Sequence, residues 1–395
     1  MEKPKIRFLK NKHSWVRNTF EEIAKRRTKS SDNPDLPRIE YQDIISGEGR
    51  LNKDLSKNID CRKGIVFETN DILYGKLRPY LKNWLHPNFN GIAIGDFWVL
   101  QARNCDSKFL FSLVQSPKFQ RVANDTSGTK MPRSDWKTVS QTEFSIPTSN
   151  EEQSAIGSLF CTLDDLLASY KDNLANYQSL KATMLSKMFP KAGQTVPEIR
   201  LDGFEVEWKK SKLKDVAHRV QGNDGRMDLP TLTISASGGW MNQIDRFSAN
   251  IAGKEQKNYT LLKKGELSYN HGNSKLAKYG VVFELQDYEE ALVPKVYHSF
   301  RVNQLANAKF IEIMFSTKIP DRELGKLVSS GARMDGLLNI SFEDFMNIAI
   351  IIPTIEEQQA IGTYFSNLDN LITAHQEKIS QLETLKKKHL QDMFI

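Results

Sequence analysis

Basic and amide side chains gather in two segments of the sequence, GKLRPYLKNW from Gly75 and SYNHGNSKLAKY from Ser268. Cationic groups hold the phosphates of a nucleic acid, whereas amides and imidazoles can hydrogen-bond the edges of its bases. Both segments therefore indicate contact with a nucleic acid. The candidate residues are Lys76, Arg78, Lys82, Asn270, His271, Asn273 and Lys275.

Two further segments place a cation beside a glycine. SGTKMPR from Ser127 contains Lys130 and Arg133, and SGARMDG from Ser330 contains Arg333. A glycine-bearing loop with a cation suits close approach to a backbone phosphate. Lysine and arginine beside turns are also common as plain solvated surface, so this second interpretation stays open for each residue.

Sequence signatures of catalysis are missing. No GxxxxGK[ST], HExxH or GxSxG stretch occurs, and the seven histidines have no ligand spacing. The three cysteines, Cys61, Cys105 and Cys161, are too few and too far apart for a zinc site or a disulfide framework. We therefore expect a non-catalytic chain that binds no metal or cofactor of its own.

Composition agrees with a folded protein that meets a polyanion. The 395 residues suggest two or three domains. Lys and Arg number 55 against 48 Asp and Glu, giving a net charge of +7 and a pI near 9.0. The start of the chain lacks the apolar core of a signal peptide, and no apolar run approaches the roughly 20 residues that span a bilayer. We expect a cytoplasmic location.

The elements that position these segments are duplicated. EQSAIGSLFCTLDDLL from Glu152 returns as EQQAIGTYFSNLDNLI from Glu357. The front of each half echoes as well, with Ile6, Arg7, Trp15, Phe20, Ile23 and Ala24 answering to Ile199, Arg200, Trp208, Leu213, Val216 and Ala217. Between these similar ends the halves agree poorly. The pattern indicates one scaffold used twice with two different inserts.

Each repeated segment predicts a long helix. Ser149 with Glu152, and Thr354 with Glu357, have the spacing of a capping box, and Pro190 stops the first helix. Each helix has nearly 40 residues and a length of roughly 55 Å. Apolar residues recur at alternating steps of four and three, which is typical of a coiled coil. The predicted packing residues are Ile156, Phe160, Leu163, Leu167, Leu174, Ile361, Phe365, Leu368, Ile372, Ile379 and Leu382.

Connectivity predicts that the helices are antiparallel. The linker from Pro190 to Pro197 reaches at most about 26 Å, so the second insert begins near the far end of the first helix. The second helix must run back to bury its apolar stripe. We expect a pseudo-two-fold pair with a globular domain at each end, and Lys181 and Lys386 near opposite ends. Packing inside a single domain is the alternative for such a stripe.

The inserts predict a mixed α/β (α+β) fold, because short β-rich runs alternate with turn residues. The expected divisions are a globular domain at 1–146, a long helix with its linker at 147–196, a second globular domain at 197–352 and a second long helix at 353–395. Strand order does not follow from one sequence.

These residues resemble the specificity subunits of type I restriction-modification enzymes. The resemblance rests on IPTSNEEQSAIGSLFCTLDDLL, IPTIEEQQAIGTYFSNLDNLI, the helix endings LSKMF and LQDMF, and the two similar domain openings. It covers essentially the whole chain. The resemblance implies two target recognition domains that each read half of a bipartite DNA site, with conserved helices as spacer and docking surface. It also implies modification subunits that use S-adenosylmethionine, two in number, and restriction subunits that use ATP and Mg²⁺.

Two other functions remain open at this point. One is a self-contained enzyme that methylates or cuts DNA, and the other is a coiled-coil adaptor that binds only proteins. Activity of the purified chain alone would favour the first, and failure to bind DNA even with partners present would favour the second.

Overall fold

The computed structural model describes residues 4–7, 14–52, 62–125, 131–248, 253–272, 274–328 and 337–394. The chain forms two compact units, a first unit of Met1–Leu174 with Ala374–Ile395 and a second unit of Ala175–Thr373. Each unit is therefore closed by parts of two long helices. The domain limits expected from the sequence are not tested by this division and stay a prediction.

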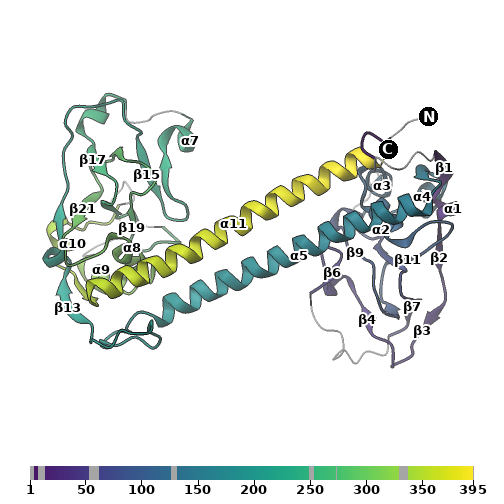
Figure 1. The fold of residues 1–395 in the computed structure, drawn as a ribbon, viewed down its shortest axis with the longest axis horizontal. Coiled ribbons are helices and arrows are strands. Elements are labelled where there is room, and N and C mark those ends of the chain that lie inside the picture. The colour runs from purple at the N-terminus through teal and green to yellow at the C-terminus, as the bar shows by residue number, and fades with distance from the viewer. Residues whose placement is uncertain are drawn as a thin grey trace. The chain divides into compact units, whose positions relative to one another are not determined.

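The two long helices begin where the capping residues predict. Helix α5 is Asn150–Lys187, with 38 residues, and helix α11 is Ile355–Met393, with 39 residues (Figure 1). The backbone N–H of Glu152 donates to Ser149 Oγ at 3.3 Å, and that of Glu357 donates to Thr354 Oγ1 at 3.4 Å. Each hydroxyl thus satisfies one of the free amides of a first helical turn.

Contacts inside each unit confirm the antiparallel direction. In the first unit Asp164 of α5 bonds Lys386 of α11, and further along α5 the ring of Tyr170 lies 5.3 Å from that of His375. Residue numbers therefore rise on one helix as they fall on the other. In the second unit Lys181 pairs with Asp369. Lys181 and Lys386 are equivalent in the sequence repeat, as are the two aspartates, so the ion pairs obey the predicted pseudo-two-fold relation.

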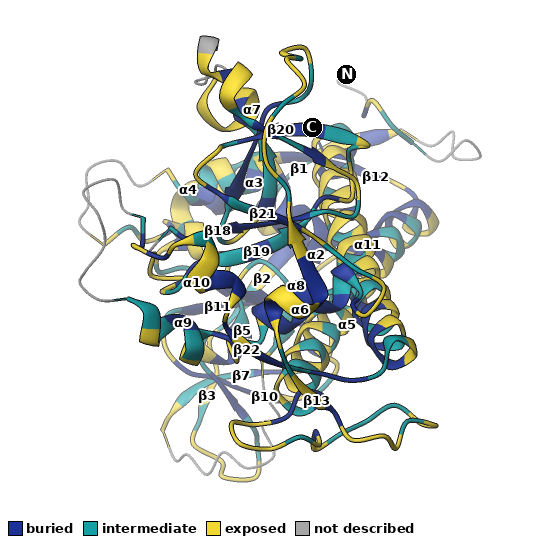
Figure 2. Ribbon diagram, turned by 90° about the vertical axis from the view of Figure 1, so that its left-hand side faces the viewer, coloured by how far each residue is buried: buried dark blue, intermediate teal, exposed yellow. Residues whose placement is uncertain are grey.

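Burial of the predicted packing residues differs along the helices, whose exposed sides are visible in Figure 2. Most of them are buried within the core of one unit, whereas Leu174, Ile372 and Ile379 are half-buried. A pair of helices alone covers only one stripe of each, so fuller burial requires a domain beside it. The buried residues are Ile156, Phe160, Leu163, Leu167, Ile361, Phe365, Leu368 and Leu382.

The first unit is built on small antiparallel sheets. Strand β1 (Trp15–Thr19) pairs with β12 (Glu143–Pro147), and a four-stranded sheet has the order β2-β11-β8-β9. A second four-stranded sheet, β3-β7-β10-β4, contains one parallel pair, β10 with β4. The further elements are α1 (Phe20–Ile23), β2 (Ala24–Arg27), β3 (Ser30–Ser31), β4 (Arg38–Ile39), η1 (Tyr41–Asp43), β5 (Ile44–Ile45), β6 (Arg50–Leu51), β7 (Gly64–Phe67), β8 (Ile72–Gly75), η3 (Pro79–Leu81), β9 (Trp84–Leu85), β10 (Gly91–Ala93), β11 (Phe97–Ala102), α2 (Ser107–Gln115), α3 (Pro117–Ala123) and α4 (Trp136–Gln141).

The second unit repeats the frame but not the insert. Strand β13 (Lys209–Lys212) pairs with β22 (Ala349–Ile352), and one sheet has the order β14-β21-β18-β19. The rest of the insert forms the hairpin β15-β16 and the pair β17-β20, whose two strands are separated in the sequence by β18 and β19. The elements are α6 (Leu213–Val216), β14 (Ala217–Arg219), β15 (Leu232–Ser235), β16 (Gly239–Asn242), α7 (Gln243–Phe247), η4 (Gly253–Asn258), β17 (Thr260–Lys263), β18 (Leu267–Asn270), β19 (Val281–Glu284), β20 (Glu290–Val293), β21 (His298–Val302), α8 (Ala308–Ser316), α9 (Asp321–Leu327) and α10 (Phe342–Met346).

A buried glutamate anchors each long helix to its unit. Glu152 accepts hydrogen bonds from Arg7 Nε at 2.9 Å, Arg7 Nη2 at 2.7 Å and Trp15 Nε1 at 3.2 Å. Glu357 accepts the equivalent hydrogen bonds from Arg200 Nε at 2.7 Å, Arg200 Nη2 at 2.6 Å and Trp208 Nε1 at 3.3 Å. A buried carboxylate needs such a partner. The glutamate of each expected capping box therefore bonds side chains far away in the sequence.

The glutamine of the repeated motif holds a second helix against each long helix, and in the first unit the glycine allows a close approach as well. In the first unit Asp106 N–H donates to Gln153 Oε1 at 2.8 Å, just ahead of α2. A Cβ on Gly157 would lie 2.5 Å from the backbone N of Phe109 in α2, so only glycine permits this approach. In the second unit Asn307 N–H donates to Gln358 Oε1 at 2.9 Å. The EEQxAIG motif is thus explained by packing.

Candidate nucleic-acid interface

The two basic segments of the first unit lie side by side. After β8 the chain forms an isolated β-bridge between Leu77 and Arg133. Arg78 N–H donates to Pro132 O at 2.7 Å, and Ser134 N–H donates to Lys76 O at 2.8 Å. The sequence treats these segments as separate candidates, and the structure joins them into one surface, which we name the first basic surface: Lys76, Arg78 and Arg133.

One carboxylate moderates the charge of this surface. Asp96 Oδ2 lies 2.9 Å from Arg133 Nη2, and Asp96 Oδ1 lies 3.6 Å from Lys76 Nζ. Arg133 remains 55% exposed and Lys76 28% exposed. Three cations against one carboxylate leave a net positive surface that can still reach a phosphate. The role of Asp96 could not be predicted, because its position in the sequence does not show which cations it contacts after folding.

Backbone geometry fixes the loop that carries the outer cations. Arg78 and Lys82 have φ values of 50° and 54°, in the left-handed region that residues other than glycine seldom adopt. Both residues are exposed. The neighbouring Tyr41 hydroxyl accepts from Leu77 N–H at 3.2 Å and donates to Asp96 O. Burial raises the pKa of Tyr41 to about 12, so the hydroxyl stays a neutral donor at physiological pH.

In the second unit the segment from Ser268 contacts the residues that follow SGARMDG, and SGARMDG itself lies outside the described residues. Gly272 forms an isolated β-bridge with Leu337, and Leu338 N–H donates to His271 O at 2.9 Å. Lys275 is exposed in the loop after β18. Asn270 is half-buried; its side-chain N–H donates to Ile234 O at 3.2 Å, and its Oδ1 accepts from Gly272 N–H at 3.1 Å. Asn270 therefore shapes this loop.

His271 lies apart from the exposed candidates. Its ring is 4% exposed, with Nδ1 at 2.7 Å from Leu338 O and Nε2 at 2.8 Å from Val296 O. Both ring nitrogens already meet main-chain oxygens, which argues against direct contact with a base. Lys130, Asn273 and Arg333 lie outside the described residues. The predicted DNA contacts stay predictions, since none is tested directly.

A stacked arginine recurs in both units and was missed from the sequence. The guanidinium of Arg26, in β2, lies 4.3 Å from the ring centroid of Trp136, and that of Arg219, in β14, lies 4.4 Å from that of Phe342. Burial lowers the pKa of Arg26. Stacking suits arginines at nucleic-acid surfaces. The signal was present, because Arg26 and Arg219 continue the register that aligns Ala24 with Ala217.

The described residues give no support to two other kinds of site. Within the ranges that the structure covers, no three His, Cys, Asp or Glu side chains are grouped as metal ligands. No helix in those ranges combines the length and apolarity that crossing a bilayer requires.

Comparisons with known proteins agree with this arrangement. The family described as type I restriction modification DNA specificity domain matches residues 205–384. The MjaVIII specificity subunit of Methanocaldococcus jannaschii is 22% identical over 350 residues, covering 82% of this chain and 78% of that protein. The EcoDI specificity subunit of Escherichia coli is 25% identical over 189 residues, covering 46% and 42%.

These matches confirm the resemblance to type I restriction-modification specificity subunits, and residues 205–384 match that family's DNA specificity domain. The fold agrees: the crystal structure of an S subunit from M. genitalium superposes with a TM-score of 0.58 at 13% identity, covering 100% of this chain and 99% of that one. The resemblance and the mixed α/β fold with two long helices are thereby confirmed. Both curated relatives are specificity subunits of type I restriction enzymes.

Proposed function

We propose that this specificity subunit binds DNA sequence-specifically, each recognition domain reading one half of an asymmetric bipartite site while the long helices set the unread spacer. The observation that carries the proposal is one frame with two different inserts. The sheet β2-β11-β8 of the first unit has the same connections as β14-β21-β18 of the second. The fourth strands, β9 and β19, also correspond, whereas the other strands of the inserts differ: the first unit has β3-β7-β10-β4 and β5-β6, and the second has β15-β16 and β17-β20. Two domains that share a scaffold but differ in their inserts are suited to reading two different DNA half-sites.

The positive surfaces supply the affinity of this proposal, and polar groups beside them supply the specificity. Neutralised phosphates release counterions and give binding that falls steeply with salt. Sequence must be read by side chains at groove edges. In the first unit Lys76, Arg78 and Arg133 would hold phosphates, and in the second Lys275 would do so.

The helices support a fixed spacer because of their length. Helix α5 has 38 residues and α11 has 39, or roughly 57 Å at 1.5 Å per residue. Removing seven residues from each, at the level where Tyr170 meets His375, shortens the pair by about 10 Å. About 10 base pairs span 34 Å, so the spacer should shorten by about three base pairs.

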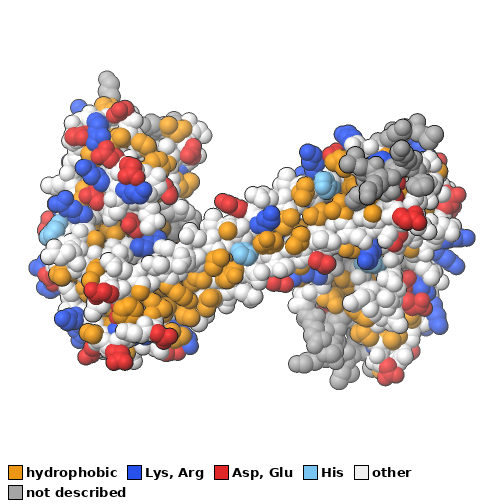
Figure 3. Space-filling view, viewed as in Figure 1, with side chains coloured by type: hydrophobic (Ala, Val, Ile, Leu, Met, Phe, Trp, Pro, Cys, Tyr) orange, Lys and Arg blue, Asp and Glu red, His pale blue; other side chains and the backbone are white. Residues whose placement is uncertain are grey.

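The partners follow from the duplicated helices. Four exposed leucines form two equivalent pairs: Leu166 and Leu371 are 42% and 40% exposed, and Leu180 and Leu385 are 37% and 41% exposed. Apolar side chains are visible on the surface of both long helices in Figure 3. Exposed apolar positions repeated by a pseudo-two-fold would suit two copies of one modification subunit. Those subunits would methylate with S-adenosylmethionine in the cytoplasm, and restriction subunits would supply the ATP- and Mg²⁺-dependent steps.

An insert exchange tests the proposal. Residues 25–146 would be replaced by the corresponding insert of another specificity subunit, and the methylated sequence would be determined for the complete complex. One half-site should change while the other half and the spacer stay as they were. Simultaneous change of both halves would contradict independent reading by the two domains.

A further inference from the structure

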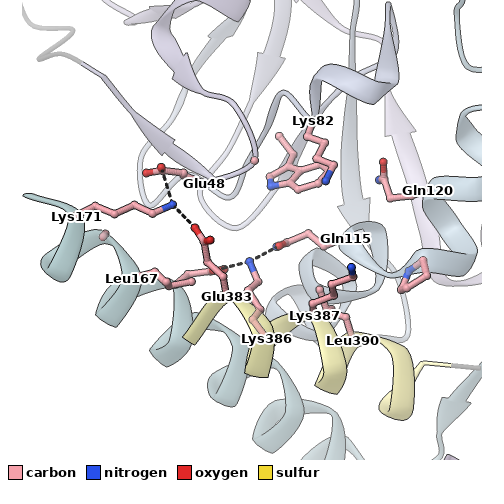
Figure 4. A pocket seen from close by; sticks show the side chains of 15 residues that line it. Glu48, Lys82, Gln115, Gln120, Leu167, Lys171, Glu383, Lys386, Lys387 and Leu390 are labelled. Carbon is pink, nitrogen blue, oxygen red and sulfur yellow. Dashed lines mark hydrogen bonds and ion pairs between the residues drawn. The ribbon is translucent and has the colours of Figure 1, made fainter. Parts of the chain in front are cut away.

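A pocket of about 370 Å³ opens inside the first unit, where the end of α11 and the middle of α5 meet the loop before β9 and the start of α3 (Figure 4). Its walls include Lys82, Trp84, Gln120, Leu167, Lys387 and Leu390. Arg78 and Arg133 do not line this pocket, which distinguishes it from the first basic surface. Lys82 was assigned to DNA by its sequence context, and the structure places it on this wall.

Several charges around the pocket are neutralised within the protein. Lys386 Nζ bonds Asp164 and donates to Gln115 Oε1 at 2.7 Å. Lys171 Nζ lies 3.1 Å from Glu48 and 2.8 Å from Glu383. These contacts are drawn as dashed lines in Figure 4. The three carboxylates of the pocket wall are thereby occupied by two lysines that also line it.

Two other lysines keep their charge available. Within the described ranges, neither Lys82 nor Lys387 forms an ion pair with a carboxylate. Figure 4 shows their side chains reaching toward the same space from opposite walls. Two ammonium groups that converge without a counter-charge are suited to an anion.

The indole of Trp84 is an independent sign of a ligand. Trp84 is 4% exposed and lines the pocket, yet its Nε1–H has no acceptor among the residues that the structure describes. A buried donor without an acceptor is rare in proteins and destabilising. The Nε1 atom is enclosed, so an oxygen atom in the pocket would accept this hydrogen bond after a small shift of the indole, while its charge meets the lysines.

The apolar part of the wall sets the size and character of the ligand. Leu167 and Leu390 are 8% and 9% exposed, and Pro117, the first residue of α3, also lines the pocket. A bare inorganic ion would leave this wall without a partner. A pocket of this volume holds a molecule of drug-fragment size with an apolar body and a few polar contacts.

We propose that this pocket binds a small organic anion, whose phosphate or carboxylate lies between Lys82 and Lys387 and accepts the Trp84 Nε1–H. The apolar body of the ligand packs on Leu167 and Leu390. Because the site is formed by α5, α11 and the first recognition domain together, its ligand joins these elements. The proposal does not depend on the reading of DNA.

Titration calorimetry of the full-length chain tests the site, with the partner subunits present throughout if the chain requires them. Phenyl phosphate and phenylacetate separate the two acid groups, and inorganic phosphate measures the contribution of the apolar body. At least one aromatic acid should bind with a Kd in the millimolar range or below, and more tightly than inorganic phosphate. K387Q, K82Q and W84F should each weaken that binding about tenfold.

Lys388→Gln is the matched control, because Lys388 is an exposed neighbour on α11 that does not line this pocket. Its affinity should equal that of the unchanged chain. K387Q alters an exposed helical residue and leaves the core intact, so it remains informative if W84F fails to fold. Absence of binding up to about 10 mM of either aromatic acid, or equal losses in K387Q and K388Q, would overturn the proposal.

Discussion

Replacing Glu357 by glutamine should destabilise the second unit strongly. The Glu357 side chain is 1% exposed and receives Arg200 at 2.6 Å. Glutamine keeps the shape but not the charge, and it leaves the guanidinium of Arg200, 15% exposed, without its carboxylate. Breaking a buried pair costs 3–5 kcal/mol, and the partial exposure of Arg200 favours the lower end, about 3 kcal/mol. The hydrogen bonds that Arg200 donates to Glu357 also raise the pKa of Arg200, so the arginine stays charged.

Differential scanning calorimetry measures this cost. For a unit of 150–250 residues, about 3 kcal/mol lowers the midpoint by roughly 6–12 °C. Glu356→Gln, at an exposed adjacent position, is the control and should change the midpoint little. Glu152→Gln should lower the transition of the first unit comparably, since Arg7 and Trp15 make the same contacts. Equal shifts for Glu357→Gln and Glu356→Gln would refute the anchoring role.

Three further predictions follow from particular contacts. Gly157→Ala should lower the free energy of unfolding in urea by about 2 kcal/mol, because the new Cβ would lie 2.5 Å from the backbone N of Phe109. Gly362→Ala should lower it by less than 1 kcal/mol, because the nearest atom there is Asn307 Oδ1 at 3.2 Å. Equal losses would contradict the close approach at Gly157. Burial lowers the pKa of His298 to about 4. The free energy of unfolding should therefore be full above about pH 6.5 and fall by up to about 3 kcal/mol toward pH 4. His298→Gln should reduce this loss, whereas the control His218→Gln, at an exposed position, should not. Arg78→Gln should reduce the slope of log K against log salt concentration for DNA binding by about 0.9. Asp96→Asn removes the carboxylate that pairs with Lys76 and Arg133, so it should tighten non-specific DNA binding. Unchanged binding in both variants would exclude the first basic surface from the DNA contact.

The periodic and repeated features of the fold could be predicted from the sequence. Apolar residues at alternating steps of four and three, from Ile156 to Leu174 and again from Ile361 to Leu382, predicted two long helices. The short linker at Pro190 predicted that the two helices run in opposite directions. Helix α5 ends at Lys187, three residues before that proline, and α11 begins at Ile355, just after Thr354. Local rules sufficed here because capping and apolar periodicity act within a few residues.

Contacts between distant residues could not be predicted in the same way. The spacing of Ser149 and Glu152 suggested a complete capping box, but the Glu152 carboxylate bonds Arg7, 145 positions earlier. Charge balance at the predicted interface likewise depends on Asp96, which meets Lys76 and Arg133 only after folding. The ion pair between Lys181 and Asp369 of the other helix is a further contact of this kind. Strand order could not be predicted for the same reason, because it depends on pairings between strands across the whole insert.

Genome-wide mapping of methylated adenines, in cells carrying the complete restriction-modification system, tests the central claim most directly. Two unlike recognition domains on one pair of helices predict a single motif with two different specified parts and a gap of constant length. A continuous motif, a palindrome with identical halves, or a gap that varies from site to site would contradict the account.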